Sequence, residues 1–426
     1  MKLLLFFIFA FILGFELEAQ DMVSLDYFLN QAEVNTPTLK ENRNLLKIGE
    51  LQNAIIQAQN KAFQVNVTSD VLVAPFFNSN GKAIDVTTTP SANAIGYDVS
   101  ITNGGLYSAQ INVMKNLFNQ AITDRLLFQN KLQNNSILLT SEELKHNLTK
   151  TITDAYIVAY QLQLQESFTK DILKDLENRL QVVELMVKRA VLMESDYLLL
   201  QLDIDSKKLE LQQIQNSLKV AINQLYILSS VPVRNTESLD VPTITAITNP
   251  NSLFYQKKFE NDSLQLLANQ NVFESRYKPQ VSAYANTGLN ASEIPNIYRK
   301  IGASAGIRLT IPIYDGNQRK YNAQQSLLKE ESLAFYKENS KIQMKNNLES
   351  IRQQINQNEI TLLLLEKQLK KQENILEIYK GKLVQGQVSI VDYLTVIQNY
   401  KLNVYTKLQM QTNRWLLLSQ YNYINW

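Results

Sequence analysis

The sequence predicts a mainly α-helical protein with a smaller β part, built from two copies of one helix–strand–strand–long helical hairpin unit. Two observations carry this prediction. Residues 106–231 contain neither Gly nor Pro, and residues 317–426 contain no Pro and only two Gly, which indicates very long helices. The landmarks of the first stretch also return 196 residues later: Leu117 as Ile313, Phe118 as Tyr314, Ala190 as Gly386 and Asp196 as Asp392.

The order of segments follows from this duplication. Residues 1–19 are expected to form a secretory signal peptide, with Lys2, an apolar run and the small Ala19 at the cleavage edge. The first repeat should cover residues 20–231 and the second repeat residues 250–426. Between them, residues 232–249 should form a linker that contains prolines. The helical hairpins are expected at about 116–229 and 317–421. Their apolar residues recur every 3.5 positions, as in supercoiled helices: Leu173, Leu176, Leu180, Val183 and Val187.

Four strands are predicted, at about 63–75, 97–113, 280–288 and 300–313, because apolar and polar residues alternate there. Val67 and Leu309 belong to the apolar face, and Thr68 and Thr310 to the polar face. The strands are long enough to cross a membrane, although a small soluble sheet would show the same alternation. Aromatic residues near the strand ends suggest an interfacial belt or ordinary strand composition: Phe76, Phe77, Tyr97, Tyr107 and Tyr284.

Four strands cannot close a barrel by themselves. In lipid, each unpaired backbone group at an open edge costs several kcal/mol, so membrane-embedded strands would require the chain to oligomerise. Two chains would supply eight strands, whose side chains fill the interior, whereas three would supply twelve and leave room for a passage.

Composition removes several classes of function. The net charge of +2 gives no electrostatic footprint for nucleic acid, and the absence of cysteine excludes disulfides, thiolate metal sites and a lipid-modified N-terminal Cys. His146 is the only histidine, and beside Lys145 on a charged helix face it is expected to be solvated. We therefore expect no catalytic residues, no metal site, no cofactor and no enzymatic activity.

The two hairpin tips are the candidate functional region. A reversal between long helices needs a residue that tolerates positive φ, which Gly386 supplies. Val384, Val388 and Ile390 would then be apolar residues at a solvent-facing end, either for a partner or for packing between the two helices.

Carboxylates follow both turns at matching positions. Asp196 and Asp392, with Glu194 as a weaker candidate, could form a ring around an oligomer axis that favours cations. The alternative for Asp392 is structural, because Ser389 and Asp392 have the spacing of a helix capping box.

This pattern resembles the TolC-type outer-membrane efflux proteins over nearly all of the expected mature chain. Residues 309–316 (LTIPIYDG) are similar to the family's strand-to-helix junction, and residues 383–394 (LVQGQVSIVDYL) to its second hairpin tip. The sequence departs from the family where Ala190 replaces the usual glycine and where Val388 replaces a frequent arginine.

The resemblance implies a homotrimer with a twelve-stranded outer-membrane barrel continued by a periplasmic α-helical barrel. Such a protein is a passive exit duct for an efflux pump or type I secretion system, in contact with outer-membrane lipid, a periplasmic adaptor and an inner-membrane pump. The implied docking residues are Ala190, Val191, Leu192, Val384, Gly386, Gln387, Val388, Ser389 and Ile390. The alternative is a periplasmic adaptor or coiled-coil scaffold, although two equivalent hairpins and only four strands do not favour it.

Overall fold

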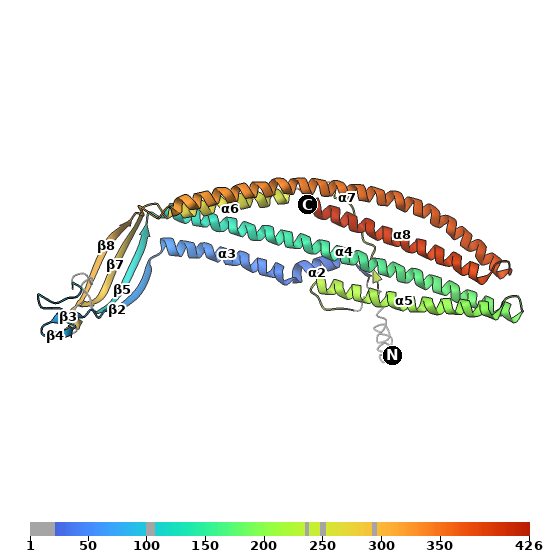
Figure 1. The fold of residues 1–426 in the computed structure, drawn as a ribbon, viewed down its shortest axis with the longest axis horizontal. Coiled ribbons are helices and arrows are strands. Elements are labelled where there is room, and N and C mark those ends of the chain that lie inside the picture. Colours follow the sequence, from blue (N-terminus) through green and yellow to red (C-terminus); the bar gives the residue numbers. More distant parts are fainter. Residues whose placement is uncertain (1–21, 99–106, 235–237, 248–252, 292–295) are drawn as a thin grey trace, which may run out of the picture. The chain divides into compact units, whose positions relative to one another are not determined.

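The computed structural model describes residues 22–98, 107–234, 238–247, 253–291 and 296–426 (Figure 1). The expected signal peptide lies outside these residues. The chain divides into two compact units. The first comprises Met1–Arg43, Leu139–Gln256 and Lys337–Trp426, and the second comprises Asn44–Leu138 and Lys257–Tyr336. Each unit therefore takes segments from both expected repeats.

Two helical hairpins supply most of the first unit. In one hairpin α4 (Gln120–Lys188) is followed by α5 (Glu194–Leu228), and in the other α7 (Gln318–Val384) is followed by α8 (Ile390–Ile424). Helices α5 and α8 have 35 residues each, and both their first and last residues are 196 positions apart. Their length follows from sequences free of helix breakers.

A hydrophobic core holds the two hairpins together toward their tips. The expected seam residues Leu176 and Val183 of α4 are buried in it, and Leu173, Leu180 and Val187 pack against it. The other hairpin contributes the buried Tyr393 and Ile397 of α8. Burying one such side chain contributes about 1.5–3 kcal/mol, so this core is a large source of stability in the first unit.

A second core lies under the N-terminal segment. Helix α2 (Leu25–Asn35) begins at the N-cap Ser24, and its buried Phe28 makes edge contacts with Tyr156 and Tyr226. Strand β1 (Met22–Val23) pairs in parallel with β6 (Ser238–Leu239). The Tyr156 hydroxyl lies 2.9 Å from the Val23 carbonyl oxygen and 2.8 Å from that of Asp240, which ties both segments to α4.

The second unit carries an antiparallel four-stranded sheet of order β2-β5-β7-β8, whose strands lie side by side in Figure 1. Helix α3 precedes β2 and helix α6 precedes β7, while β5 leads into α4 and β8 into α7. The register therefore brings all four helix connections to one end of the sheet. The bounds are α3 Pro37–Lys61, β2 Gln64–Val71, β5 Tyr107–Leu117, α6 Leu253–Ser275, β7 Gln280–Ala291 and β8 Ile301–Thr310.

Several boundaries differ from the sequence prediction. The second strand was expected from residue 97, but its described part is β5, and residues 99–106 lie outside the described chain. The expected loop after the first strand contains a hairpin, β3 (Phe76–Ser79) and β4 (Lys82–Asp85). Strand β8 ends at Thr310 because Pro312 has no N–H to donate to a ladder. None of the described helices is both long and apolar enough to cross a membrane.

Candidate functional site

Both hairpins reverse through the same hydrogen-bonded turn. In each, one N–H donates to the carbonyl three residues back and the next N–H to the carbonyl five residues back, the pair of bonds that defines a Schellman motif. The bonds are Ala190 to Val187 (2.9 Å), Val191 to Met186 (2.9 Å), Gly386 to Leu383 (3.0 Å) and Gln387 to Lys382 (2.9 Å). The residue that reverses the chain is Ala190 in the first tip and Gly386 in the second, with φ angles of 59° and 68°.

The missing glycine of the first tip therefore does not change the turn. Ala190 adopts the left-handed conformation that its Cβ makes unfavourable, at a cost of about 1 kcal/mol. The two tips are also neighbours, because a Cβ added to Gly386 would lie 3.3 Å from Val191 Cγ1.

The candidate acidic residues all lie in the first turn of a helix. The Asp392 Oδ2 accepts a hydrogen bond from the Ser389 hydroxyl (2.7 Å), and the Ser389 Oγ accepts one from the Asp392 N–H (3.1 Å). The Asp196 Oδ2 accepts from the N–H of Met193 (3.0 Å). Asp392 and Glu194 are exposed and Asp196 is partly exposed. The capping role is therefore present at both tips, and it leaves the carboxylates accessible to solvent.

The candidate docking residues divide by burial. Val384, Gly386, Gln387 and Ser389 are exposed on the second tip, and Ala190 and Val191 on the first. Leu192 and Val388 are partly buried and pack against the core of the two hairpins. The prediction that Ile390 faces solvent is wrong. Its side chain is 0% exposed, because Ile390 is the first residue of α8 and is buried in that core.

Polar contacts join the two hairpins below the tips. The buried Tyr393 of α8 donates a hydrogen bond to Asp175 Oδ2 of α4 (3.0 Å), and Lys380 Nζ of α7 lies 3.3 Å from Asp175 Oδ1. Burial, followed by the nearby negative charge of Asp175, raises the pKa of Tyr393. Tyr393 therefore stays a neutral donor at physiological pH.

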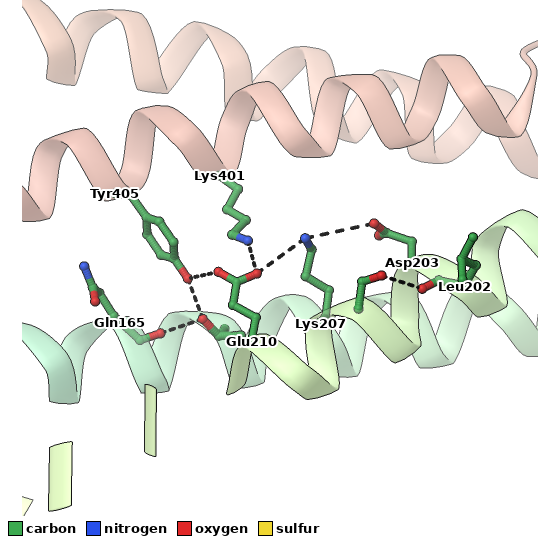
Figure 2. Close-up of polar contacts among 9 residues, drawn as sticks. Gln165, Leu202, Asp203, Lys207, Glu210, Lys401 and Tyr405 are labelled. Atoms are coloured by element: carbon green, nitrogen blue, oxygen red, sulfur yellow. Dashed lines mark hydrogen bonds and ion pairs between the residues drawn. The ribbon is translucent and has the colours of Figure 1, made fainter. Parts of the chain in front are cut away.

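A second polar cluster, which we call the Glu210 cluster, joins α5 to α8 and α4 (Figure 2). The Glu210 carboxylate accepts hydrogen bonds from the Lys401 ammonium and from the Tyr405 hydroxyl, the latter at 2.9 Å. Lys207 Nζ lies 3.5 Å from the same carboxylate, and the Tyr405 oxygen lies 2.7 Å from Thr169 Oγ1. Both lysines are buried.

Burial and hydrogen bonding set the protonation of this cluster. Burial alone would raise the pKa of Glu210, but the hydrogen bonds from Lys401 and Tyr405 hold that pKa below its ordinary value. Burial lowers the pKa of Lys401 in spite of its bond to Glu210, and raises the pKa of Tyr405 to about 12. The carboxylate is therefore charged at neutral pH and compensates Lys401, and it compensates Lys207 together with Asp203, whose Oδ1 lies 4.0 Å from the Lys207 ammonium.

Sequence reasoning missed the Glu210 cluster, although a signal was present. The apolar seam of α5 steps from Leu200 to Ile204 and then to Lys207, so a charged residue occupies a core position. Such a lysine requires a carboxylate partner nearby. Asp203 and Glu210 lie four residues before and three residues after Lys207 on the same helix, so these partners could be inferred from the sequence. That Lys401 of α8 joins them could not be known without the packing.

His146 is also placed differently from the expectation. Its ring is stacked on Tyr423 (4.8 Å between centroids) and on Trp426 (4.0 Å), and its Nε2 lies 2.9 Å from the Tyr423 carbonyl oxygen. Trp426 in turn stacks on Phe254 (3.8 Å). Burial lowers the pKa of His146. The expectation that His146 is solvated is wrong, because the C-terminal end of α8 and Trp426 cover this part of α4.

The sheet has one apolar and one polar face, as the alternation predicts. Directly opposed residues share a face, and the register sets Val67 against Ile111 on the apolar face and Thr68 against Gln110 on the polar face. The polar face carries hydrogen bonds between side chains of adjacent strands, such as Asn112 to Thr68 (2.8 Å) and Ser304 to Asn286 (2.6 Å). Most strand residues on both faces are exposed or only partly buried within one chain.

This arrangement of a two-faced sheet and paired helical hairpins is the fold of the TolC-type outer-membrane channels. The outer membrane protein VceC of Vibrio cholerae superimposes with a TM-score of 0.69 at 14% identity, covering 94% of this chain and 96% of that one. The outer-membrane channel OprN gives 0.72 at 14% identity, covering 94% and 89%. The Campylobacter jejuni outer membrane channel CmeC gives 0.71 at 12% identity, covering 94% and 85%.

Comparisons with models of protein families and with curated proteins gave no match. The likeness is therefore one of fold, at an identity too low to carry individual side chains from one chain to another.

Proposed function

We propose that this protein is the outer-membrane exit duct of a tripartite efflux pump or a type I secretion system. It would act as a passive, homotrimeric conduit for small molecules or an exported polypeptide. A periplasmic adaptor would connect it to an inner-membrane pump that supplies the energy. The observation that carries the proposal is the sheet, which has an apolar face, a polar face and two free edges.

The free edges argue for association of several chains. Strands β2 and β8 each pair on one side only among the described strands, so each leaves a row of backbone groups unpaired. In lipid these groups must find partners, and β8 of one copy can pair with β2 of the next. Three copies would give twelve strands, with the apolar faces toward lipid and the polar faces around a lumen.

The assembly can be tested on the intact protein. Cell fractionation should place it in the outer membrane as a heat-labile oligomer, and the purified protein in detergent should have the mass of three chains. It should also conduct ions across planar bilayers. A monomer that inserts stably into bilayers would contradict the barrel formed by several chains.

We further propose that Asp392 and Asp196, with Glu194 beside them, line the constriction of the conduit. In a trimer, equivalent carboxylates on three chains would gather around the axis and favour cations. Asp392 is exposed and Asp196 partly exposed, and capping hydrogen bonds hold both in place, so they could face a lumen without disturbing the helix starts.

Two variants separate the constriction from the cap. Asp392→Asn removes the charge and keeps an oxygen that can accept the Ser389 hydrogen bond, so it should weaken a block of conductance by divalent cations. Ser389→Ala removes the cap and keeps the charge, so the block should persist although the helix start loses about 1 kcal/mol. An undiminished cation block in the Asp392→Asn, Asp196→Asn double variant would exclude the carboxylate ring.

The exposed tip residues are the proposed adaptor-docking surface. Val191 and Val384 present apolar side chains to solvent beside Gly386, and Ile390 takes no part because it is buried. Val191→Asp or Val384→Asp should abolish export while trimers still reach the outer membrane. Loss of the trimer in both variants would show that these residues only stabilise the hairpins.

A further inference from the structure

The end of the sheet that joins the helices, which we call the rim, carries very exposed apolar side chains. Phe118 follows β5 and is 91% exposed, and Ile313 and Tyr314 follow β8 and are 95% and 82% exposed. Phe118 and Tyr314 are the equivalent residues of the two repeats. Aromatic side chains form girdles at both interfaces of membrane barrels, so Phe118 and Tyr314 give this end the character of a membrane boundary.

A lysine stands on the apolar face close to the rim. The register places Lys115 opposite Ala283, which in turn faces Ile307, so Lys115 shares the face of the apolar strand residues. Its ammonium lies 4.6 Å from the centroid of the Phe63 ring. Among the residues of β2, β5, β7 and β8, Lys115 is the one charged side chain on this face.

The position of Lys115 is informative because a lysine facing lipid is strongly destabilising at mid-membrane and costs little at the interface. Its ammonium therefore belongs at the level of the lipid headgroups, where the side chain can extend toward water over Phe63.

Further cations surround Lys115 at the rim. The rim carries six cations, at the strand and helix ends and in the segments between them, and two carboxylates. The cations are Lys61, Lys115, Arg276, Lys278, Arg319 and Lys320, and the carboxylates are Glu274 and Asp315. Glu274 pairs with Arg319 at 2.7 Å, and Asp315 accepts hydrogen bonds from the Tyr277 hydroxyl and the Arg319 N–H. In the described part of the chain no ion pair joins a carboxylate to any of the other five cations. The rim is therefore strongly positive.

We propose that the rim binds the phosphate groups of anionic phospholipids in the leaflet that faces the helices. Lys115, Lys278 and the neighbouring cations would contact the headgroups while the adjoining apolar face contacts the acyl chains. The occupant is a lipid rather than a free anion because charge and apolar surface adjoin in one place. This inference rests on the proposed insertion of the sheet in the outer membrane.

The test compares lipids on the purified, detergent-solubilised protein. Native mass spectrometry would measure the binding of dioleoylphosphatidylglycerol relative to dioleoylphosphatidylcholine. Each cation near a membrane surface contributes about a fivefold preference for anionic lipid, so Lys115→Gln combined with Lys278→Gln should reduce the preference about 25-fold. The matched control is Arg299→Gln combined with Lys300→Gln, at the opposite end of the sheet, which should keep the preference.

Three outcomes would overturn the inference: no anionic preference in the unmodified protein, an equal loss in the control variant, or displacement of the lipid by soluble glycerol phosphate at equal concentration. Conductance in planar bilayers separates this inference from the proposed function. A conducting protein without lipid preference would refute the inference alone, whereas a protein that never conducts would refute the exit duct.

Discussion

Replacing Glu210 by Gln should strongly destabilise the packing of the two hairpins. Among the described residues, Glu210 is the one carboxylate that pairs with the buried Lys401, and it shares the buried Lys207 with Asp203, whose Oδ1 lies 4.0 Å from the Lys207 ammonium. The substitution keeps the side-chain volume and a hydrogen-bonding oxygen, but it leaves the buried Lys401 ammonium beside Lys207 without a carboxylate partner. Breaking a buried pair costs about 3–5 kcal/mol, and we expect about 3 kcal/mol because 27% of the Glu210 side chain is exposed.

Denaturation of the purified protein, followed by circular dichroism at 222 nm, would measure this cost. The control is Glu366→Gln, which breaks an ion pair of 3.1 Å between α7 and α8 whose side chains are 32% and 48% exposed. That pair is open to solvent, so its loss should cost less than about 1 kcal/mol. Equal effects of the two substitutions would refute the argument from burial.

The pH dependence of the unfolding free energy of Glu210→Gln gives a second check. Burial already lowers the pKa of Lys401 in the folded protein, and removal of Glu210 should lower it further. The unfolded chain then binds more protons than the folded one, so stability rises with pH until the lysine of the unfolded chain also loses its proton near pH 10. The deficit of Glu210→Gln should shrink between pH 7 and about 10. A deficit that does not change over this range would show that lost packing, not charge, causes it.

Three further predictions concern the tips, the histidine and the sheet. Ala190→Gly should raise the unfolding free energy by about 1 kcal/mol by relieving its left-handed strain, and Gly386→Ala should lower it by at least as much, measured by denaturation. Because the pKa of His146 is lowered in the folded protein, the unfolded chain binds a proton first as the pH falls. The unfolding free energy should therefore be constant above about pH 6.5 and decrease below it, and His146→Gln should remove this decrease. Val67→Asp should reduce membrane insertion, whereas Thr68→Asp should not; equal tolerance would favour a soluble sheet.

The parts of the fold that could be predicted depend on local rules. The hairpins follow from stretches without Gly or Pro, and the left-handed turn at Gly386 follows from the conformational freedom of glycine. The two faces of the sheet follow from alternation, since directly opposed residues share a face. These features depend on the chain within a few residues of each position.

The parts that could not be predicted depend on contacts between distant segments. The bond between Glu210 and Lys401 spans 191 residues, and the stacking of His146 on Tyr423 spans 277. Local pattern also left two interpretations of Tyr284 open, an interfacial belt and ordinary strand composition. Tyr284 stands opposite Gly306 on the polar face, where the Arg308 guanidinium lies 5.4 Å from its ring. The absent side chain of Gly306 makes room for that ring, and only the register reveals this.

The two interpretations of Asp392, as a cap and as a constriction residue, support each other. One carboxylate oxygen accepts the Ser389 hydroxyl at 2.7 Å, which restricts the side-chain rotamer, while the residue stays exposed. A carboxylate held in this way loses less conformational entropy on meeting a cation than a free side chain would. Asp196 is held similarly by the N–H of Met193. Substitution by Ala removes both properties at once, so only variants that separate charge from capping, such as Asp392→Asn and Ser389→Ala, can assign the effect on conductance to one of them.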